Sequence, residues 1–338
     1  MPLPPTQPAA QPPSPPSPAP WITVCVCSHE RADYLRDCLD GLRLQTATGE
    51  FAVLVVDSGS SPAGARAMAA AVQGFAGTRL LRVDRPGLSL ARNTAARGIT
   101  TPYVAFLDDD AIPTPTWIAA IHAAIAAQAE PLAMLSGAIR PLWEAPLPAW
   151  WPADLRGVLS IVEVEGAGEY RQPGVAQTLE PIGANMILRV ADLRAAGGFL
   201  ETIGRDGATL LSDEEKVLAW RLQEAGRAVR YDSRIVVYHQ IQAQRLTTGW
   251  LLARMYWQGV SKVRSARSLG GAAEIRREAV RRLLVLLLLA PVALIPGHWT
   301  CLIALRWRLA YALGFLRELP RRRVGAPAGD SLPAMALT

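Results

Sequence analysis

Short apolar runs alternate with helical segments over the first third of the chain, and this alternation constrains the fold most. The apolar runs are 22–27, 52–57, 78–83 and 103–107. The intervening segments predicted as helices are 32–44, 63–72 and 89–97, the last opening with Ser89 as its cap. Short, continuously apolar strands separated by helices are typical of a parallel sheet covered on both faces. The sequence therefore predicts an α/β fold with a mostly parallel, Rossmann-like sheet.

A second strand–helix unit follows a segment, 140–180, that is rich in Trp and Pro. We expect that segment to supply loops and an edge strand over the site. The unit itself is predicted as a strand, two helices and two further strands, at 181–189, 191–196, Asp213–Ala225, 228–231 and 234–238. Gly197 and Gly198 are expected to end the first of these helices. The globular part should close with the last strand.

The C-terminal part differs in charge and hydropathy. Residues 1–244 carry 20 basic and 25 acidic side chains, whereas residues 245–323 carry 15 basic and only 3 acidic ones. Residues 283–305 hold no charged side chain apart from His298, and 23 such residues are long enough to span a bilayer. Pro291 and the pair Pro296–Gly297 would break a straight helix. We therefore expect a membrane-bound hairpin or an interfacial pair of helices at an anionic membrane, rather than one straight span, with a buried core helix as the alternative.

These features divide the chain into four parts. Residues 1–20 are rich in Pro and Ser and are predicted to be a disordered tail, and 21–244 form the α/β domain. Residues 245–323 form a basic, apolar, membrane-associated helical region, and 324–338 form a flexible tail. Four cysteines are too few for a disulfide framework, which favours a reducing compartment. Arginines that border an apolar run suit a lipid surface, so nucleic-acid binding is not expected.

Three consecutive acids, Asp108–Asp110, follow the apolar run at 103–107. In parallel sheets, ligands bind beyond the carboxyl ends of the strands, and Asp57 ends another strand at the same edge. Adjacent carboxylates repel one another, whereas Mg²⁺ and Mn²⁺ are held by carboxylate oxygens together with substrate phosphates. Thr114 and Pro115 are expected to cap the next helix without help from these acids. The triplet therefore predicts a divalent-metal site.

A second acid triplet, Asp213, Glu214 and Glu215, admits two interpretations. Ser212 and Glu215 have the spacing of a capping box, which would account for the acids by itself. Alternatively, one of them is a general base that takes a proton from a hydroxyl group. His239, at the end of an apolar strand, is either structural or a ligand of a metal or diphosphate. The residues alone leave these alternatives open.

The motifs together resemble those of family 2 glycosyltransferases of the GT-A fold. The resemblance covers about residues 22–240 and rests on S-x-x-R after the first strand, VVDSGSS, GLSLARNTA, YVAFLDDDAIP, GAN, GGF and the late acid pair before a helix ending in AG. It implies that Asp57 holds the base of a nucleotide sugar. It also implies further donor-binding residues: Ser28, Glu30, Arg31, Arg92, Asn93, Asp108 and Asp109.

The resemblance also implies a metal and a base. The D-x-D position corresponds to Asp108–Asp110, with Asp110 as the direct metal ligand, and Asp108 and His239 are further candidate ligands. Glu214 and Glu215 correspond to the catalytic acid pair, and Glu215 stands where family members commonly carry an aspartate base. Which of the three late acids acts as base stays open.

The implied reaction is the Mg²⁺- or Mn²⁺-dependent, inverting transfer of one sugar from a nucleoside-diphosphate sugar to a hydroxyl group. Gln242 and Arg245 match the Q-x-x-R-W motif of processive members, but Leu246 replaces its tryptophan, so we expect a single addition. The acceptor is expected to be a sugar or a lipid-linked molecule at the inner face of a bacterial plasma membrane. The pathways implied are surface-polysaccharide, lipid-linked oligosaccharide or glycolipid synthesis. The alternatives are a nucleotidyltransferase of similar fold and a non-catalytic, membrane-anchored transferase domain.

Overall fold

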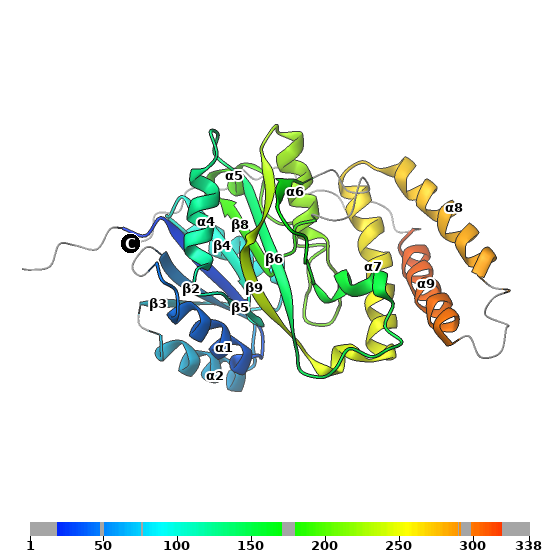
Figure 1. Ribbon diagram of the computed structural model, residues 1–338, viewed down its shortest axis with the longest axis horizontal. Helices are drawn as coiled ribbons and strands as arrows, with labels where there is room; N and C mark the ends of the chain where they lie inside the picture. The colour runs from blue at the N-terminus through cyan, green and yellow to red at the C-terminus, as the bar shows by residue number, and fades with distance from the viewer. Residues whose placement is uncertain are drawn as a thin grey trace, which may run out of the picture.

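The computed structural model describes residues 19–47, 51–75, 77–170, 180–289, 291 and 299–319. Within these residues, nine strands form one sheet with helices on both faces, and three long helices lie at one end of the molecule (Figure 1). The predicted tails fall outside the described residues, apart from residues 19 and 20. So do residues 290 and 292–298 of the apolar C-terminal run.

The first half of the sheet is parallel, as predicted. Its order is β3-β2-β1-β4, and its strands are β1 (Ile22–Ser28), β2 (Phe51–Ser58), β3 (Thr78–Val83) and β4 (Tyr103–Asp108). The connecting helices are α1 (Ala32–Arg43), α2 (Pro62–Gln73) and α3 (Leu88–Gly98). Each lies within two residues of its predicted bounds.

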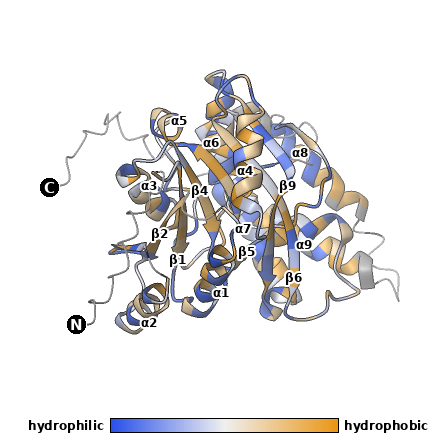
Figure 2. Ribbon diagram, turned by 60° about the vertical axis from the view of Figure 1, so that its left-hand side comes forward, coloured by the Kyte–Doolittle hydropathy of each residue, from blue (hydrophilic) through white to orange (hydrophobic). Residues whose placement is uncertain are grey.

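Alternating side chains of these strands build two separate cores. Val24 and Val55 face α1, α2 and α4 (Trp117–Ala126), whereas Cys25 and Val56 face α3, α5 (Val190–Ala195) and α6 (Glu214–Glu224). Successive side chains of a strand point to opposite faces, so a continuously apolar strand needs cover on both. Figure 2 shows these apolar strands enclosed between helices.

The second half of the sheet is mixed, which corrects the expectation of a mostly parallel sheet. β8 (Asn185–Arg189) runs antiparallel to both β4 and β6 (Met134–Trp143), and β6 runs parallel to β9 (Val229–Ile241). The short strands β5 (Ala111–Pro113) and β7 (Ala167–Glu169) pair antiparallel with β9. The two strands predicted at 228–238 are one strand, in which the expected break is a register shift. Strand direction depends on long-range pairing, which apolar runs do not encode.

Two predicted helix caps are absent. α3 has Gly87 as its N-cap, and the hydroxyl of Ser89 is buried without a partner. α4 begins two residues later than expected, because Thr114 donates its hydroxyl to the backbone oxygen of Val236 on β9, at 3.2 Å. Pairing of β5 with β9 holds this segment extended. Thr114 and Pro115 therefore do not cap the next helix as predicted, and α4 follows Thr116 instead.

The C-terminal helices are α7 (Thr248–Ser268), α8 (Ala272–Leu289) and α9 (Trp299–Glu318). They follow the 3-10 helix η3 (Ala243–Leu246). A second 3-10 helix, η1 (Ala153–Leu159), packs with η3, α7 and α9 in one apolar cluster. α7 and α9 lie close together because Gly259 and Gly314 face each other's helix, where a Cβ would collide with a backbone carbonyl. Among the described residues, no helix combines the length and hydropathy needed to cross a bilayer.

Candidate active site

The first acid triplet and Asp57 lie at one edge of the sheet, as predicted. Asp57 pairs in register with Ser28, and Asp108 pairs with Cys27, so the ends of β2, β1 and β4 are aligned. Chain reversals after these strands leave the acids at the carboxyl edge, where open α/β sheets bind ligands. The side chains of Asp57, Asp109 and Asp110 are buried.

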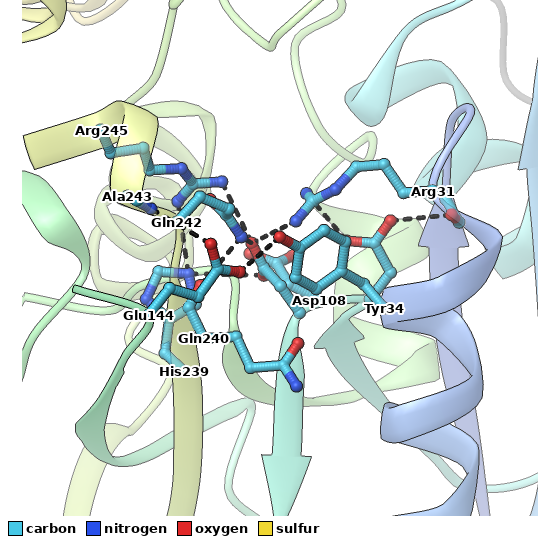
Figure 3. A network of polar contacts seen from close by, with 12 residues as sticks. Arg31, Tyr34, Asp108, Glu144, His239, Gln240, Gln242, Ala243 and Arg245 are labelled. Atoms are coloured by element: carbon cyan, nitrogen blue, oxygen red, sulfur yellow. Dashed lines mark hydrogen bonds and ion pairs between the residues drawn. The ribbon is translucent and has the colours of Figure 1, made fainter.

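Asp110 is the most heavily contacted of these acids. Its Oδ2 lies 2.7 Å from Arg31 Nη2, 3.0 Å from Arg245 Nη2 and 3.1 Å from Gln242 Nε2, and its Oδ1 lies 3.4 Å from His239 Nε2. Figure 3 shows Arg31 and Arg245 reaching toward this centre from opposite sides. Burial alone raises the pKa of Asp110, but His239 and the two arginines outweigh it and hold the pKa well below its usual value. Asp110 is therefore a fixed negative charge.

Asp109 shares Arg31 with Asp110. Ser28 donates its hydroxyl to Asp109 Oδ2 at 2.7 Å, and Arg31 Nη1 lies 3.0 Å from Oδ1. Burial and the nearby charge of Asp110 raise the pKa of Asp109 to about 7 despite these contacts. Arg31 is thus the cation that offsets repulsion between adjacent carboxylates.

Asp57 and Glu30 hold the loops after β2 and β1. The backbone N–H of Ser60 donates to Asp57 Oδ1 at 3.0 Å, and Arg82 Nη1 lies 2.7 Å from Oδ2. The carboxylate of Glu30 accepts from the backbone N–H of Ser61. Both acids therefore lie where the predicted nucleotide pocket would form, and their charges are engaged by neighbouring loop residues.

Arg92, on α3, joins the two acid triplets. Its Nη2 lies 3.2 Å from Asp108 Oδ1, and its Nη1 lies 3.0 Å from Glu214 Oε1. The guanidinium is 2% exposed, and Gly183 leaves room for it, since a Cβ there would collide with Arg92. Burial alone lowers the pKa of Arg92, but Asp108 and Glu214 raise it on balance. The glycine of the GAN motif therefore serves this bridge.

Asn93, predicted beside the donor, contacts backbone instead. Its carboxamide accepts from the N–H of Phe199 at 2.8 Å and donates to the oxygen of the same residue at 2.9 Å. These bonds hold the chain just after Gly197 and Gly198, which both have positive φ. The structure does not bring Asn93 into contact with either acid triplet.

Asp213 is the N-cap of α6, and the predicted capping box does not form. Ser212 is held by α7 instead: its hydroxyl lies 3.2 Å from both Gln258 Oε1 and Arg254 Nη2. Asp213 accepts from Gln258 Nε2 at 3.1 Å and lies 3.2 Å from Lys216 Nζ. Burial alone raises the pKa of Asp213, but Lys216 and Gln258 lower it on balance. Asp213 is therefore also a fixed negative charge.

Glu215 differs from the other acids of the two triplets in having no contacting cation among the described residues. Among the described residues it has no ion-pair partner, and its buried Oε2 has no hydrogen-bond partner. Burial, followed by the charge of Glu214, raises the pKa of Glu215 to about 8, and Arg92 offsets this only in part. A carboxylate with such a pKa takes up a proton near neutral pH, as a general base must.

The predicted metal ligands are not assembled into a site. Within the described part of the chain, no three His, Cys, Asp or Glu side chains are grouped so that they could hold a metal ion. Asp110 and His239 are in contact, but Asp108 turns to Arg92, with 32% of its side chain exposed. The carboxylate donors suit Mg²⁺ or Mn²⁺ in chemistry. A metal ion would have to compete with arginine for Asp110.

Several residues at the site were not predicted from sequence. In the sequence, Gln242 and Arg245 stand out only through the spacing of a processivity motif. That spacing is the signal that could have indicated their contact with Asp110. Arg254 and Gln258, on α7, and Arg205, in the loop before α6, carried no local signal. Only packing of α7 against the start of α6 brings Arg254 and Gln258 to the acids.

Comparison with known proteins supports the predicted family. The model of Glycosyl transferase family 2 matches residues 23–136. The chain is 27% identical over 180 residues to a glucosyl-dolichyl phosphate glucuronosyltransferase of Haloferax volcanii, covering 53% of this chain and 56% of that protein. It is 28% identical over 244 residues to a pre-mycofactocin glycosyltransferase of Mycobacterium tuberculosis, covering 70% and 46%. The chain thus spans about half the length of these curated relatives.

Solved structures show the same fold at low sequence identity. A mannosyltransferase of Pyrobaculum calidifontis in complex with GDP-Man and Mn²⁺ is 19% identical, with a TM-score of 0.56 over 89% of this chain and 88% of that one. TarS residues 1–349 of S. aureus, in complex with UDP-GlcNAc, is 16% identical, with a TM-score of 0.51 over 71% and 66%. Together with the family match over residues 23–136 and the curated relatives, this shared fold supports a glycosyltransferase of family 2.

Proposed function

We propose that this protein transfers one sugar from a nucleoside-diphosphate sugar to a hydroxyl group of an acceptor, with inversion at the anomeric carbon. The observation that carries the proposal is the bridge Asp108–Arg92–Glu214. It joins a strand-end centre of fixed charges to a helix start that holds the unpaired Glu215. Transfer of a sugar requires one centre for the diphosphate and one for the proton.

The donor is assigned to the carboxyl edge of the sheet. Asp57 and Glu30 hold the two loops that would line the base and ribose. Arg31 and Arg245 already lie at the charged centre and can offset the negative charge of a diphosphate. Bound nucleotide sugars in the structures of the Pyrobaculum mannosyltransferase and of TarS support this class of donor.

Asp108, Asp110 and His239 are the residues that would hold Mg²⁺ or Mn²⁺. The metal would supply positive charge that stabilises the departing diphosphate. The Mn²⁺ in the Pyrobaculum structure supports this assignment. Arg31 and Arg245 balance Asp110 in the absence of the ion, so metal affinity should depend on how readily they are displaced.

Glu215 is assigned as the general base. It accepts the proton of the acceptor hydroxyl while that oxygen attacks the anomeric carbon opposite the leaving diphosphate, so the configuration inverts. Arg92 contacts Glu214, and Lys216 contacts Asp213. These two acids therefore position the start of α6, and Glu215 moves the proton.

The nucleoside diphosphate provides the first experiment. Thermal shifts with UDP, GDP and dTDP, with and without Mn²⁺, should show stabilisation by one of them that increases with the metal. A nucleotide at about 100 times its Kd stabilises by about 2.7 kcal/mol. Asp110→Asn, which keeps the shape of the side chain, should lose the metal-dependent part. Equal stabilisation of Asp110→Asn and wild type would refute the metal assignment.

A lipid-linked acceptor at an anionic membrane surface is proposed from α8 and α9. Large apolar side chains are exposed on one face of each helix: Val280, Leu283, Leu284, Leu287 and Leu288 on α8, and Leu309, Leu313 and Leu316 on α9. Arginines border both faces. The Haloferax relative is named as a glucosyl-dolichyl phosphate glucuronosyltransferase, and this name supports a lipid-linked acceptor. The setting would be the inner face of the plasma membrane, in polysaccharide, lipid-linked oligosaccharide or glycolipid synthesis.

The double substitution Leu284→Ser and Leu288→Ser should weaken binding to phosphatidylglycerol vesicles by about tenfold, because two exposed leucines no longer enter the lipid. Vesicle co-sedimentation measures this. Leu44→Ser, which changes an exposed leucine outside these helices, should have no effect. Surface substitutions are preferable to deletion of residues 270–338, because α9 covers apolar side chains of α7. Unchanged vesicle binding by the double variant would refute this surface.

A further inference from the structure

Arg254 is a buried guanidinium without a carboxylate partner. Its Nη1 lies 3.3 Å from the backbone oxygen of Leu210, its Nη2 lies 3.2 Å from the hydroxyl of Ser212, and its Nε is buried without any partner. Its residue is 8% exposed. A buried cation is normally paired with an anion. Arg254 therefore keeps an N–H donor without an acceptor, next to Ser212 and the acids Asp213–Glu215.

Arg205 is a second cation without a partner. Its backbone oxygen accepts from the N–H of Leu88 at 2.8 Å, which fastens the loop before α6 to the start of α3. Among the described residues, its side chain makes no hydrogen bond or ion pair. Arg205 lies in the same loop that Arg254 contacts at Leu210 and Ser212. Its charge also contributes to lowering the pKa of both Arg245 and Arg254, after the larger effect of burial.

The arginines at the strand end of the site contact carboxylates, whereas those in and beside the loop before α6 do not. Arg31 and Arg245 contact Asp109 and Asp110 at the strand end. Arg205 and Arg254 have no such contacts, and Arg254 is bonded to Ser212, which precedes the triplet containing Glu215. These arginines without a carboxylate in contact therefore border the proposed base rather than the proposed diphosphate centre, and Asp213, Glu214 and Glu215 act on Arg254 only at longer range.

We propose that Arg205 and Arg254 form a phosphate subsite that binds the phosphate group of the acceptor. This rests on the proposed function, because Glu215 defines the acceptor side. Guanidinium groups bind phosphate oxygens through paired, charge-assisted hydrogen bonds. Anchoring the acceptor through its phosphate places its hydroxyl group within reach of Glu215. The acceptor is then a molecule that carries both a phosphate and a free hydroxyl group, such as a lipid-linked sugar phosphate.

Isothermal titration of the full chain with octyl phosphate, inorganic phosphate and the nucleoside diphosphate that stabilises it most tests the subsite. Wild type should bind octyl phosphate while saturated with the nucleotide, and more tightly than inorganic phosphate. Arg205→Ala should weaken octyl phosphate binding by about tenfold, since a charge-assisted hydrogen bond is lost, and change nucleotide affinity by less than twofold. Arg254→Lys keeps the positive charge but loses the paired N–H donors of the guanidinium, so it should also weaken octyl phosphate binding.

Arg79→Ala is the matched control, because Arg79 is exposed on β3 and has no hydrogen-bond or ion-pair partner among the described residues. It should change neither affinity. Competition between octyl phosphate and the nucleotide, or an equal loss of nucleotide binding in Arg205→Ala, would assign these arginines to the donor and overturn the proposal. Equal affinity for octyl and inorganic phosphate would overturn the acceptor assignment. A wild type that binds nucleotide but no octyl phosphate refutes the subsite alone, whereas failure to bind nucleotide counts against the proposed function.

Discussion

Two triplets of consecutive acids face the same site but differ in how their charges are held. In Asp108–Asp110, at the end of β4, every carboxylate contacts an arginine. In Asp213–Glu215, at the start of α6, the first two acids contact Lys216 and Arg92, and the third has no cationic partner among the described residues. Similar sequence patterns therefore produce different charge states.

The difference separates fixed charge from proton transfer. His239 and two arginines hold the pKa of Asp110 well below its usual value although burial opposes them, whereas burial raises the pKa of Glu215 to about 8. Both residues are buried, so burial alone does not decide the outcome. Between these two residues the contacting cations make the difference, whereas Asp109, which contacts Arg31 but lies beside Asp110, has a pKa raised to about 7.

The substitution Glu215→Gln should have the largest effect on this comparison. It removes the proton acceptor and keeps the shape of the side chain, so sugar transfer should fall by about 100-fold or more. Affinity for the nucleoside diphosphate should stay within twofold. Transfer is measured as release of the nucleoside diphosphate from the matching sugar donor in the presence of acceptor.

Glu224→Gln is the control, because Glu224 is exposed at the other end of α6. If transfer persists in Glu215→Gln, Glu214 or Asp213 becomes the candidate base, and the contrast between the triplets loses its functional meaning.

Arg92→Met breaks the bridge between the triplets. It leaves Asp108 and Glu214 without their shared cation, and removing one partner of a buried ion pair costs about 3–5 kcal/mol. The free energy of unfolding from chemical denaturation should fall by this amount. Arg97→Met, an exposed site on the same helix, should change it by less than about 0.5 kcal/mol. A loss below about 1 kcal/mol for Arg92→Met would show that the two triplets are held independently.

The pH dependence of stability should show a smaller effect. The folded protein binds the Glu215 proton more tightly than the unfolded chain, for which the usual pKa is 4.5. Between pH 4.5 and about 8, the unfolded state releases this proton more readily, so the contribution of Glu215 to the free energy of unfolding falls as pH rises. The free energy of unfolding should change through this group by at most about 1.4 kcal/mol per pH unit.

Denaturation of wild type and Glu215→Gln at pH 6 and pH 7 isolates this contribution, since other groups titrate in both. The stability advantage of Glu215→Gln over wild type should grow between the two values. Transfer by wild type should rise with pH toward about 8, as the base becomes ionised. A constant difference in stability would contradict a raised pKa for Glu215.

Local signals in the sequence succeeded for strands and for the Gly197–Gly198 stop after α5, and failed for helix N-caps. The apolar runs matched β1 to β4 closely, because a strand buried on both faces must be apolar throughout. Ser89, Thr114 and Ser212 all have cap-forming side chains, yet none caps a helix. Thr114 and Ser212 instead bond with groups on β9 and α7, which are distant in sequence. A local cap is outcompeted when tertiary packing offers another partner.

The sequence by itself determined the α/β class and the shared edge of Asp57 and Asp108–Asp110, because carboxyl ends of neighbouring parallel strands must meet. Only the tertiary structure decided the mixed half of the sheet and the charge of each acid. Asp110 meets Arg245 across 135 positions of sequence, and Arg92 meets Glu214 across 122. A carboxylate's pKa depends on burial and on nearby cations, and these are properties of the folded chain.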